Sequence, residues 1–175
     1  PIRYDKKKTR GFIMIVDNSE KKESSFYEPE DRGYLITEAI NEKSRNLDKL
    51  STNQLVQLFS IEDLKPQKAV SLALAEIEKS IDKIAYKLEK GGRLFYLGSG
   101  TSGRLGVLDS AECPPTFCTD PELVQGIIAG GYQALYKSSE NLEDSCEDAK
   151  NELVSRNYSN KDVLVGITAG GTTPF

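Results

Sequence analysis

The chain has 175 residues, of which 38% are hydrophobic and 29% are charged, so it can bury one sizeable core in a globular fold. Its formal net charge of −4 argues against nucleic-acid binding, which usually requires a basic face. No signal peptide is visible, and no apolar run approaches the roughly 20 residues that a membrane-spanning helix needs, so we expect a cytoplasmic protein without a membrane partner.

Cysteine and histidine usage narrows the possible chemistry. The cysteines are Cys113, Cys118 and Cys146, an odd number without Cys-x-x-Cys spacing, which argues against a disulfide framework and against a zinc site. The chain has no histidine, which removes Ser-His-Asp and Cys-His catalysis and histidine-bound metals. Acid–base chemistry must then come from carboxylates, Lys, Tyr or Cys.

Residues 1–33 show little organisation, and we expect a loosely ordered arm there. The basic stretch Lys6–Lys8 and the polar stretch Asp17–Ser25 are typical of solvated surface. Between them, Phe12–Val16 is apolar and has the length of one short strand.

Residues 34–92 are predicted to form an N-terminal helical segment. It has a possible helix start at Thr37-Glu38 and a capped short helix that begins at Ser51-Thr52.

Pro66 then opens the strongest predicted helix, Gln67–Lys90, which Gly91-Gly92 ends. Apolar residues recur at helical spacing on one face of that helix, which indicates either core or a dimer face: Val70, Leu74, Ile77, Ile81, Ile84 and Leu88.

A glycine-rich turn is the feature around which the rest of the chain is organised. The apolar run Leu94–Leu97 leads into Gly98–Gly106, and a predicted helix, Arg104–Glu112, leads out. A strand, a glycine turn and a helix N-terminus in this order form an anion site, because free N–H groups and the helix dipole favour negative charge. The turn also carries three hydroxyl groups, those of Ser99, Thr101 and Ser102. The pattern predicts a site for a phosphate monoester.

Other interpretations of this turn are weaker. The spacing matches G-x-G-x-x-G, the pattern of dinucleotide-binding sites. Such a site also requires an acidic residue at the end of the next strand, and Ile127–Gly131 has none. Glu122 lies at about the right distance but precedes that strand, and no Gly-Lys-Ser/Thr follows for an ATP P-loop. A purely structural strand-to-helix turn stays open, although it poorly explains three hydroxyls among three glycines.

From residue 93 to residue 175, strand-like and helix-like segments alternate, which is typical of a domain with a parallel, doubly wound α/β sheet. The predicted strands are Arg93–Leu97, Leu123–Ala129 and Asp162–Ile167. The predicted helices are Arg104–Glu112, stopped by Pro114-Pro115, then Tyr132–Tyr136 and Cys146–Arg156, with a small-residue loop at Thr168–Phe175. Three strands are few for a sheet with both faces covered, so we expect the sheet to be truncated after the third.

The stretch Gly98–Phe117, GSGTSGRLGVLDSAECPPTF, resembles N-acetylmuramic acid 6-phosphate etherases, which belong to the sugar isomerase (SIS) superfamily of phosphosugar-binding domains. The similarity covers about residues 35–175, with supporting matches at Leu35–Glu38, Leu50–Thr52, Ile127–Gly131, Glu140–Ser145 and Asp162–Ile167.

This resemblance implies a three-layer α/β/α sandwich with strand order 2-1-3-4-5, in a cytoplasmic homodimer that uses no cofactor and no metal. That order puts the loops Gly98–Gly103 and Thr168–Thr173 together at the switch point between the first and third strands, where ligands bind in such sheets. The implied substrate is a phosphorylated amino sugar. Because the family is longer, we expect little or no etherase activity from a chain that ends at Phe175, with one sheet edge open.

The predicted substrate-binding residues lie in these two loops: Ser99, Gly100, Thr101, Ser102 and Gly103 in the first, and Thr173 in the second. The second loop departs from the family's usual Ser-Gly-Arg-Thr-Pro, since Gly170 and Thr172 stand where the family has Ser and Arg. The departure bears on affinity or on substrate choice.

The implied reaction cleaves the D-lactyl ether by elimination, and water then adds at C3 to give N-acetylglucosamine 6-phosphate and D-lactate. A base removes the C2 proton and an acid protonates the leaving oxygen, so two carboxyl groups suffice. By their match to the family's motifs, Glu112 is implied to be the acid and Glu143 the base, while Asp109, Glu140 and Asp144 are weaker candidates. The weaker alternative for each glutamate is an ordinary surface carboxylate. Cys113 is better explained as a buried small hydrophobe than as a nucleophile.

A rival class is a non-catalytic module that senses sugar phosphates, as in the glucokinase regulatory protein, which resembles the same etherases. A sugar-phosphate isomerase is a third possibility and also needs an acid–base pair. The block Glu112–Thr116 is similar to the enzyme branch and favours the etherase. Release of lactate, as opposed to binding without turnover, distinguishes the classes.

Overall fold

The computed structural model of the chain describes residues 13–16, 37, 39–138 and 142–175. The chain divides into two compact units, one made of residues 1–25 and 81–175 and the other of residues 26–80. The arm predicted over residues 1–33 lies outside the described residues, apart from 13–16. There, Ile13–Val16 forms β1, so the strand predicted in this region is confirmed.

The unit of residues 26–80 is helical where it is described. Two 3₁₀ turns, η3 (Glu42–Ser44) and η4 (Leu47–Lys49), precede α1 (Thr52–Glu62). Ser51 caps α1 as predicted, because its side chain accepts from the Gln54 N–H while the Gln54 side chain accepts from the Ser51 N–H. Glu38 of the possible helix start at Thr37-Glu38 lies outside the described residues, and the described residues between it and α1 include the two 3₁₀ turns.

The single helix predicted over Gln67–Lys90 is wrong, because the chain forms α2 (Leu64–Ser71) and α3 (Leu74–Glu89) instead. Pro66 lies in the first turn of α2, where its missing N–H has no helical acceptor in any case. At the break, the Ser71 hydroxyl donates to the Lys68 carbonyl at 2.7 Å, a local bond that competes with the helical pattern. Within the described residues, no helix has the length and hydropathy needed to span a membrane.

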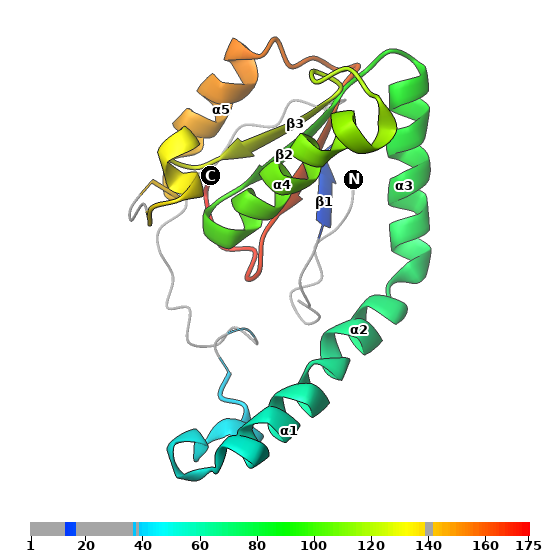
Figure 1. Cartoon of the computed structure of the whole chain (residues 1–175). Helices are drawn as coiled ribbons and strands as arrows, with labels where there is room; N and C mark the ends of the chain where they lie inside the picture. The colour runs from blue at the N-terminus through cyan, green and yellow to red at the C-terminus, as the bar shows by residue number, and fades with distance from the viewer. Residues whose placement is uncertain (1–12, 17–36, 38, 139–141) are drawn as a thin grey trace. The chain divides into compact units, whose positions relative to one another are not determined.

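The sheet has the order β1-β4-β2-β3, in which β2 (Leu94–Gly98), β3 (Val124–Ile128) and β4 (Val163–Ile167) are parallel (Figure 1). The three parallel strands therefore follow the predicted order 2-1-3. β1 pairs antiparallel with β4, with Ile13 opposite Ile167. The edge of β4 that was expected to stay open is thus paired within the chain.

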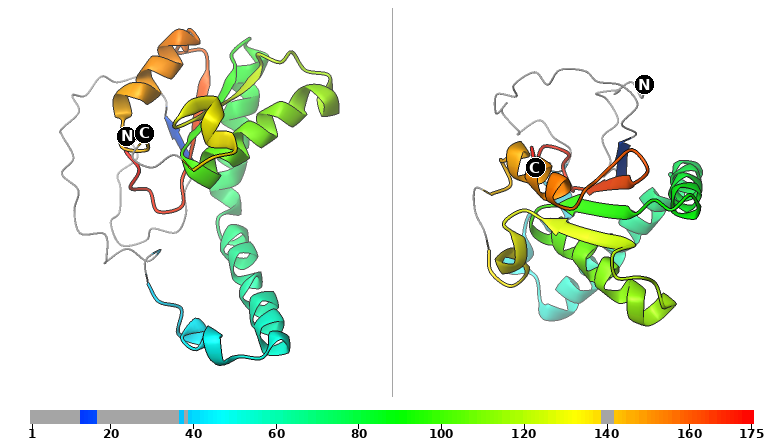
Figure 2. Two further views of the ribbon diagram at one scale, coloured as in Figure 1. Left: turned by 60° about the vertical axis from the view of Figure 1, so that its left-hand side comes forward. Right: turned by 90° about the horizontal axis from the view of Figure 1, so that it is seen from above.

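Helices cover both faces of the sheet, as predicted for a three-layer α/β/α fold. The connection from β2 to β3 is α4 (Gly100–Phe117), and the connection from β3 to β4 includes α5 (Cys146–Ser155) on the opposite face (Figure 2). On the face of α4, the core is the cluster Leu94, Val124, Val163 and Val165, with Ile84 and Leu88 of α3 packed against it. On the other face, the buried Phe95 ring meets Tyr158 edge-on, with centroids 5.4 Å apart.

Helix α4 is longer at both ends than the predicted Arg104–Glu112, and the expectation that Pro114-Pro115 stop it is wrong. Both prolines lie in its last turn, and Cys118 ends it in the left-handed region with φ of 55°. The last turn is closed by the Cys118 N–H, which donates to the Pro114 carbonyl at 2.9 Å, since a proline lacks the N–H but keeps its carbonyl acceptor.

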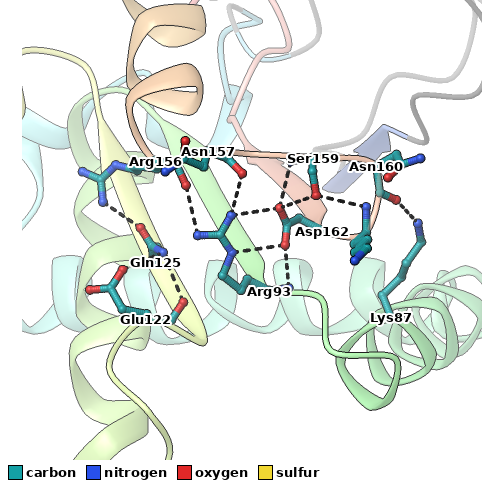
Figure 3. Close-up of polar contacts among 10 residues, drawn as sticks. Lys87, Arg93, Glu122, Gln125, Arg156, Asn157, Ser159, Asn160 and Asp162 are labelled. Carbon is teal, nitrogen blue, oxygen red and sulfur yellow. Dashed lines mark hydrogen bonds and ion pairs between the residues drawn. The ribbon is translucent and has the colours of Figure 1, made fainter.

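An ionic network ties the amino ends of β2 and β4 together (Figure 3). The Arg93 guanidinium donates to both carboxylate oxygens of Asp162, from Nε at 3.2 Å and from Nη2 at 3.0 Å, and also to the carbonyls of Arg156 and Asn157. The Asp162 side chain is only 4% exposed. Burial by itself raises the pKa of this carboxyl, but hydrogen bonds from Arg93 and Ser159 outweigh it and hold the pKa below its ordinary value.

Candidate functional site

The predicted switch point lies at the carboxyl ends of β2 and β4. These strands are parallel neighbours, and Gly98 at the end of β2 pairs with Ile167 at the end of β4. The chain runs from β2 outward to β3 and then returns to β4 on the other side of β2. The loops that follow Gly98 and Ile167 therefore leave the same edge side by side, as predicted.

The first turn of α4 presents backbone N–H groups at this edge. The helix begins at Gly100, so the N–H groups of Gly100, Thr101 and Ser102 have no carbonyl partner within the helix. Ser99 is the N-cap, but its side chain makes no capping hydrogen bond. Gly100 has φ of +53°, a conformation that glycine adopts without strain. This geometry suits an anion at the positive end of the helix dipole.

The other glycines of the motif serve packing. A Cβ added at Gly103 would lie 2.4 Å from the Gly98 carbonyl oxygen, and one at Gly106 would lie 2.7 Å from the Tyr96 Cβ. Gly103 is buried, and its N–H donates to the Ser99 carbonyl at 3.2 Å. Packing thus explains Gly98, Gly103 and Gly106. It does not explain Gly100, where an added Cβ would meet no atom within 4 Å.

Glu143 lies in the segment before α5, and the structure brings it to this turn. The Ser99 hydroxyl donates to Glu143 Oε2 across 3.4 Å, and the Phe175 N–H donates to the Glu143 carbonyl at 3.0 Å. The Cys146 thiol contacts the Pro174 carbonyl at 2.8 Å. The segment that carries Glu143 is therefore fastened to the loop after β4, which also contains the half-buried Thr173.

Glu112 is not brought to the same place. It lies on α4, twelve residues beyond Gly100, which separates the two by about 18 Å along the helix axis. Its side chain is exposed. Next to it, burial and the charge of Asp109 raise the pKa of the Cys113 thiol, which donates to the Asp109 carbonyl at 3.3 Å. Cys113 is thus a half-buried thiol packed on the core, as the sequence indicated.

Arg104 is a residue of this site that the motif analysis missed. Its guanidinium donates to the carbonyl of Leu135 at 3.1 Å and to that of Lys137 at 3.3 Å. It thereby fastens the 3₁₀ helix η5 (Gly131–Leu135), which follows β3, to the first turns of α4. No local sequence pattern predicts this contact, because the acceptors are main-chain carbonyls more than 30 residues away.

Comparison with known proteins agrees with this arrangement. Residues 76–175 match the sequence model of the glucokinase regulatory protein N-terminal SIS domain, and the chain belongs to this family. The predicted resemblance to etherases is confirmed: the chain is 61% identical over 146 residues to the N-acetylmuramic acid 6-phosphate etherase of Gloeothece citriformis, and 60% identical over the same length to those of Crocosphaera subtropica and a Nostoc species. Each match covers 83% of this chain and 48% of the relative. The chain thus spans about half the length of the curated relatives it matches.

Proposed function

We propose that this chain carries the phosphosugar-binding part of an N-acetylmuramic acid 6-phosphate etherase that acts in the cytoplasm on amino sugars recovered from the cell wall. The observation that carries the proposal is the position of Glu143 against the glycine turn at the switch point of the sheet. The 61% identity to an etherase supports the choice of substrate. The products are N-acetylglucosamine 6-phosphate and D-lactate.

In this proposal the phosphate of the substrate lies at the start of α4. It accepts hydrogen bonds from the N–H groups of the first turn and from the hydroxyls of Thr101 and Ser102. Glu143 takes the C2 proton, which the C1 aldehyde of the open-chain sugar makes acidic, and the C3–O bond breaks as Glu112 protonates the ether oxygen. Water then adds at C3.

The separation between Glu112 and Glu143 supports a homodimer with a shared site. On α4, the exposed residues at positions i, i+4, i+7, i+11 and i+14 form one stripe: Thr101, Leu105, Leu108, Glu112 and Pro115. Leu105 and Leu108 are 54% and 58% exposed, so the middle of the stripe is apolar.

The first four residues of the stripe, Thr101, Leu105, Leu108 and Glu112, are symmetrically spaced, which suits contact with a second copy. If two copies of α4 pack antiparallel about a two-fold axis, Leu105 faces Leu108 of the other copy. Thr101 then lies opposite the other copy's Glu112, eleven residues along. Such pairing brings the acid of one chain to the phosphate site of the other, and each site becomes complete.

The two glutamates give the test of the proposed reaction in the full-length protein. Glu112→Gln should abolish lactate release yet still let the C2 proton of the product exchange with deuterated water, whereas Glu143→Gln should suppress both. Each loss should be on the order of 10²–10⁴-fold. If neither substitution slows lactate release, the etherase mechanism is wrong. Binding of sugar phosphates without any turnover would favour the sensing module instead.

Mixed dimers test the shared site separately. Glu112→Gln and Glu143→Gln proteins are each nearly inactive, but mixing them should restore lactate release, because one of the two sites in a mixed dimer then has both carboxyls. Recovery should approach about a quarter of wild-type activity, since half of the dimers are mixed and each has one intact site. No recovery after confirmed subunit exchange would contradict the shared site.

A further inference from the structure

The serine at the start of α4 behaves differently from two other serine N-caps among the described residues. Ser51 and Ser145 each accept a hydrogen bond from a backbone N–H of the helix that they cap, from Gln54 and Asp148 respectively. Ser99 has the same extended backbone, with φ of −114° and ψ of 158°, but its side chain makes no such bond. Its hydroxyl is instead turned to Glu143, donating to Oε2 across 3.4 Å.

The main chain of Glu143 is held independently of this contact. The Phe175 N–H donates to its carbonyl at 3.0 Å, and two residues later Ser145 caps α5. These backbone contacts do not fix the direction of the exposed Glu143 carboxylate. A hydroxyl has one proton to donate, so the Ser99 proton given to Glu143 is not available to a bound phosphate.

We propose that Ser99 is a positioning residue that aims the Glu143 carboxylate at the sugar, and that it is not a phosphate ligand. This inference rests on the proposed function. Thr101, Ser102 and the free N–H groups then hold the phosphate, while the adjoining Ser99 orients the base. Phosphate binding and orientation of Glu143 then both depend on one short turn. The backbone of residues 99–102 therefore sets the distance between the bound phosphate and the base.

The test compares Ser99→Ala with Ser102→Ala as a matched control in the full-length protein. Ser99→Ala should lower kcat for lactate release and the rate of C2 proton exchange about 10-fold each, while the Kd for N-acetylglucosamine 6-phosphate changes less than twofold. Ser102→Ala should do the opposite and weaken binding about 10-fold. Ser99→Thr keeps the hydroxyl and should recover most of kcat, and Ser99→Gly, a change that N-caps tolerate, should repeat the effect of alanine.

A double substitution decides whether Ser99 acts through Glu143. In a Glu143→Gln background, Ser99→Ala should cause no further loss, since the carboxylate it orients is gone. Weaker sugar-phosphate binding with unchanged kcat would show that Ser99 is a phosphate ligand, and full additivity would show that it acts elsewhere; either result overturns the inference. If the wild-type protein neither releases lactate nor exchanges the C2 proton, the proposed function itself fails.

Discussion

The two ends of the parallel sheet carry polar groups under opposite conditions. At the amino ends of β2 and β4, Asp162 is 4% exposed and is held by Arg93 and Ser159. At the carboxyl ends, the N–H groups of the first turn of α4 have no helical acceptor, and Glu143 is exposed.

The difference separates stability from function within one small sheet. At the amino end, the Arg93 guanidinium and the Asp162 carboxylate bond to each other, so removing one of them leaves the charge of the other unpaired. In the proposed function, the hydrogen-bonding groups at the carboxyl end bind the ligand, so removing one should change binding and leave folding nearly unaffected. Substitutions at the two ends test this division.

The largest expected effect is at the amino end. Asp162→Asn should lower the free energy of unfolding by about 3–5 kcal/mol, because it leaves the Arg93 guanidinium half-buried without its counter-charge. Urea unfolding monitored by circular dichroism measures the change. The matched control is Lys79→Ala, which breaks the exposed pair with Glu76 and should lower the free energy of unfolding far less. Equal losses in the two variants would contradict the division.

The same carboxyl predicts a pH dependence. In the folded chain the pKa of Asp162 lies below its ordinary value of 3.8, so its ionised form stabilises the fold above that value. This contribution is lost as the pH falls through the folded-state pKa. The free energy of unfolding of the wild type should therefore fall more steeply from pH 5 toward pH 2 than that of Asp162→Asn. Parallel curves would show that Asp162 does not titrate in this way.

Gly103→Ala should give the next largest loss of stability, about 3 kcal/mol. The new Cβ would lie 2.4 Å from the Gly98 carbonyl oxygen, a backbone atom that cannot move cheaply, and 2.6 Å from Cγ1 of the buried Ile128. The gain in helix propensity from alanine, about 1 kcal/mol, offsets only part of this. Thermal unfolding of the variant measures the effect, and a variant as stable as the wild type would show that α4 and β2 can move apart.

At the carboxyl end, Thr101→Val with Ser102→Ala should weaken sugar-phosphate binding by about 1–3 kcal/mol, from the loss of charge-assisted hydrogen bonds. Titration calorimetry with N-acetylglucosamine 6-phosphate measures the affinity. The free energy of unfolding should change by less than about 0.5 kcal/mol, because both side chains lie at the partly exposed start of α4. Unchanged affinity would contradict the anion site.

Local patterns predicted the elements of this sheet well. The strands β2, β3 and β4 lie within one residue of the predicted ranges, because each is a short apolar run between turn residues. The Ser51 cap was predictable for the same local reason. The extent of α4 was not, since the helix continues through Pro114 and Pro115, whose carbonyl groups can still accept hydrogen bonds.

The candidate site was predictable in part. Topology brings the loops after β2 and β4 together, and the strand order alone implies that. The bond from Ser99 to Glu143 joins residues 44 positions apart, and the bonds of Arg93 to Asp162 join residues 69 apart. Such pairs depend on tertiary structure, for which periodicity and propensity provide no signal.

The smallest expected effect concerns Gly100, in the same motif as Gly103. A Cβ at Gly100 would meet no atom within 4 Å, so the cost of Gly100→Ala is only the positive φ of +53°, about 1 kcal/mol. Gly100→Asn should recover part of that loss, because asparagine tolerates the left-handed region better than alanine does. At residue 103 the cost comes from steric collision, so the larger asparagine should be worse than alanine there. Thermal unfolding of the four variants measures the contrast. If asparagine is no better than alanine at residue 100, the turn demands something other than its backbone conformation, and the amide geometry proposed for the phosphate must be revised.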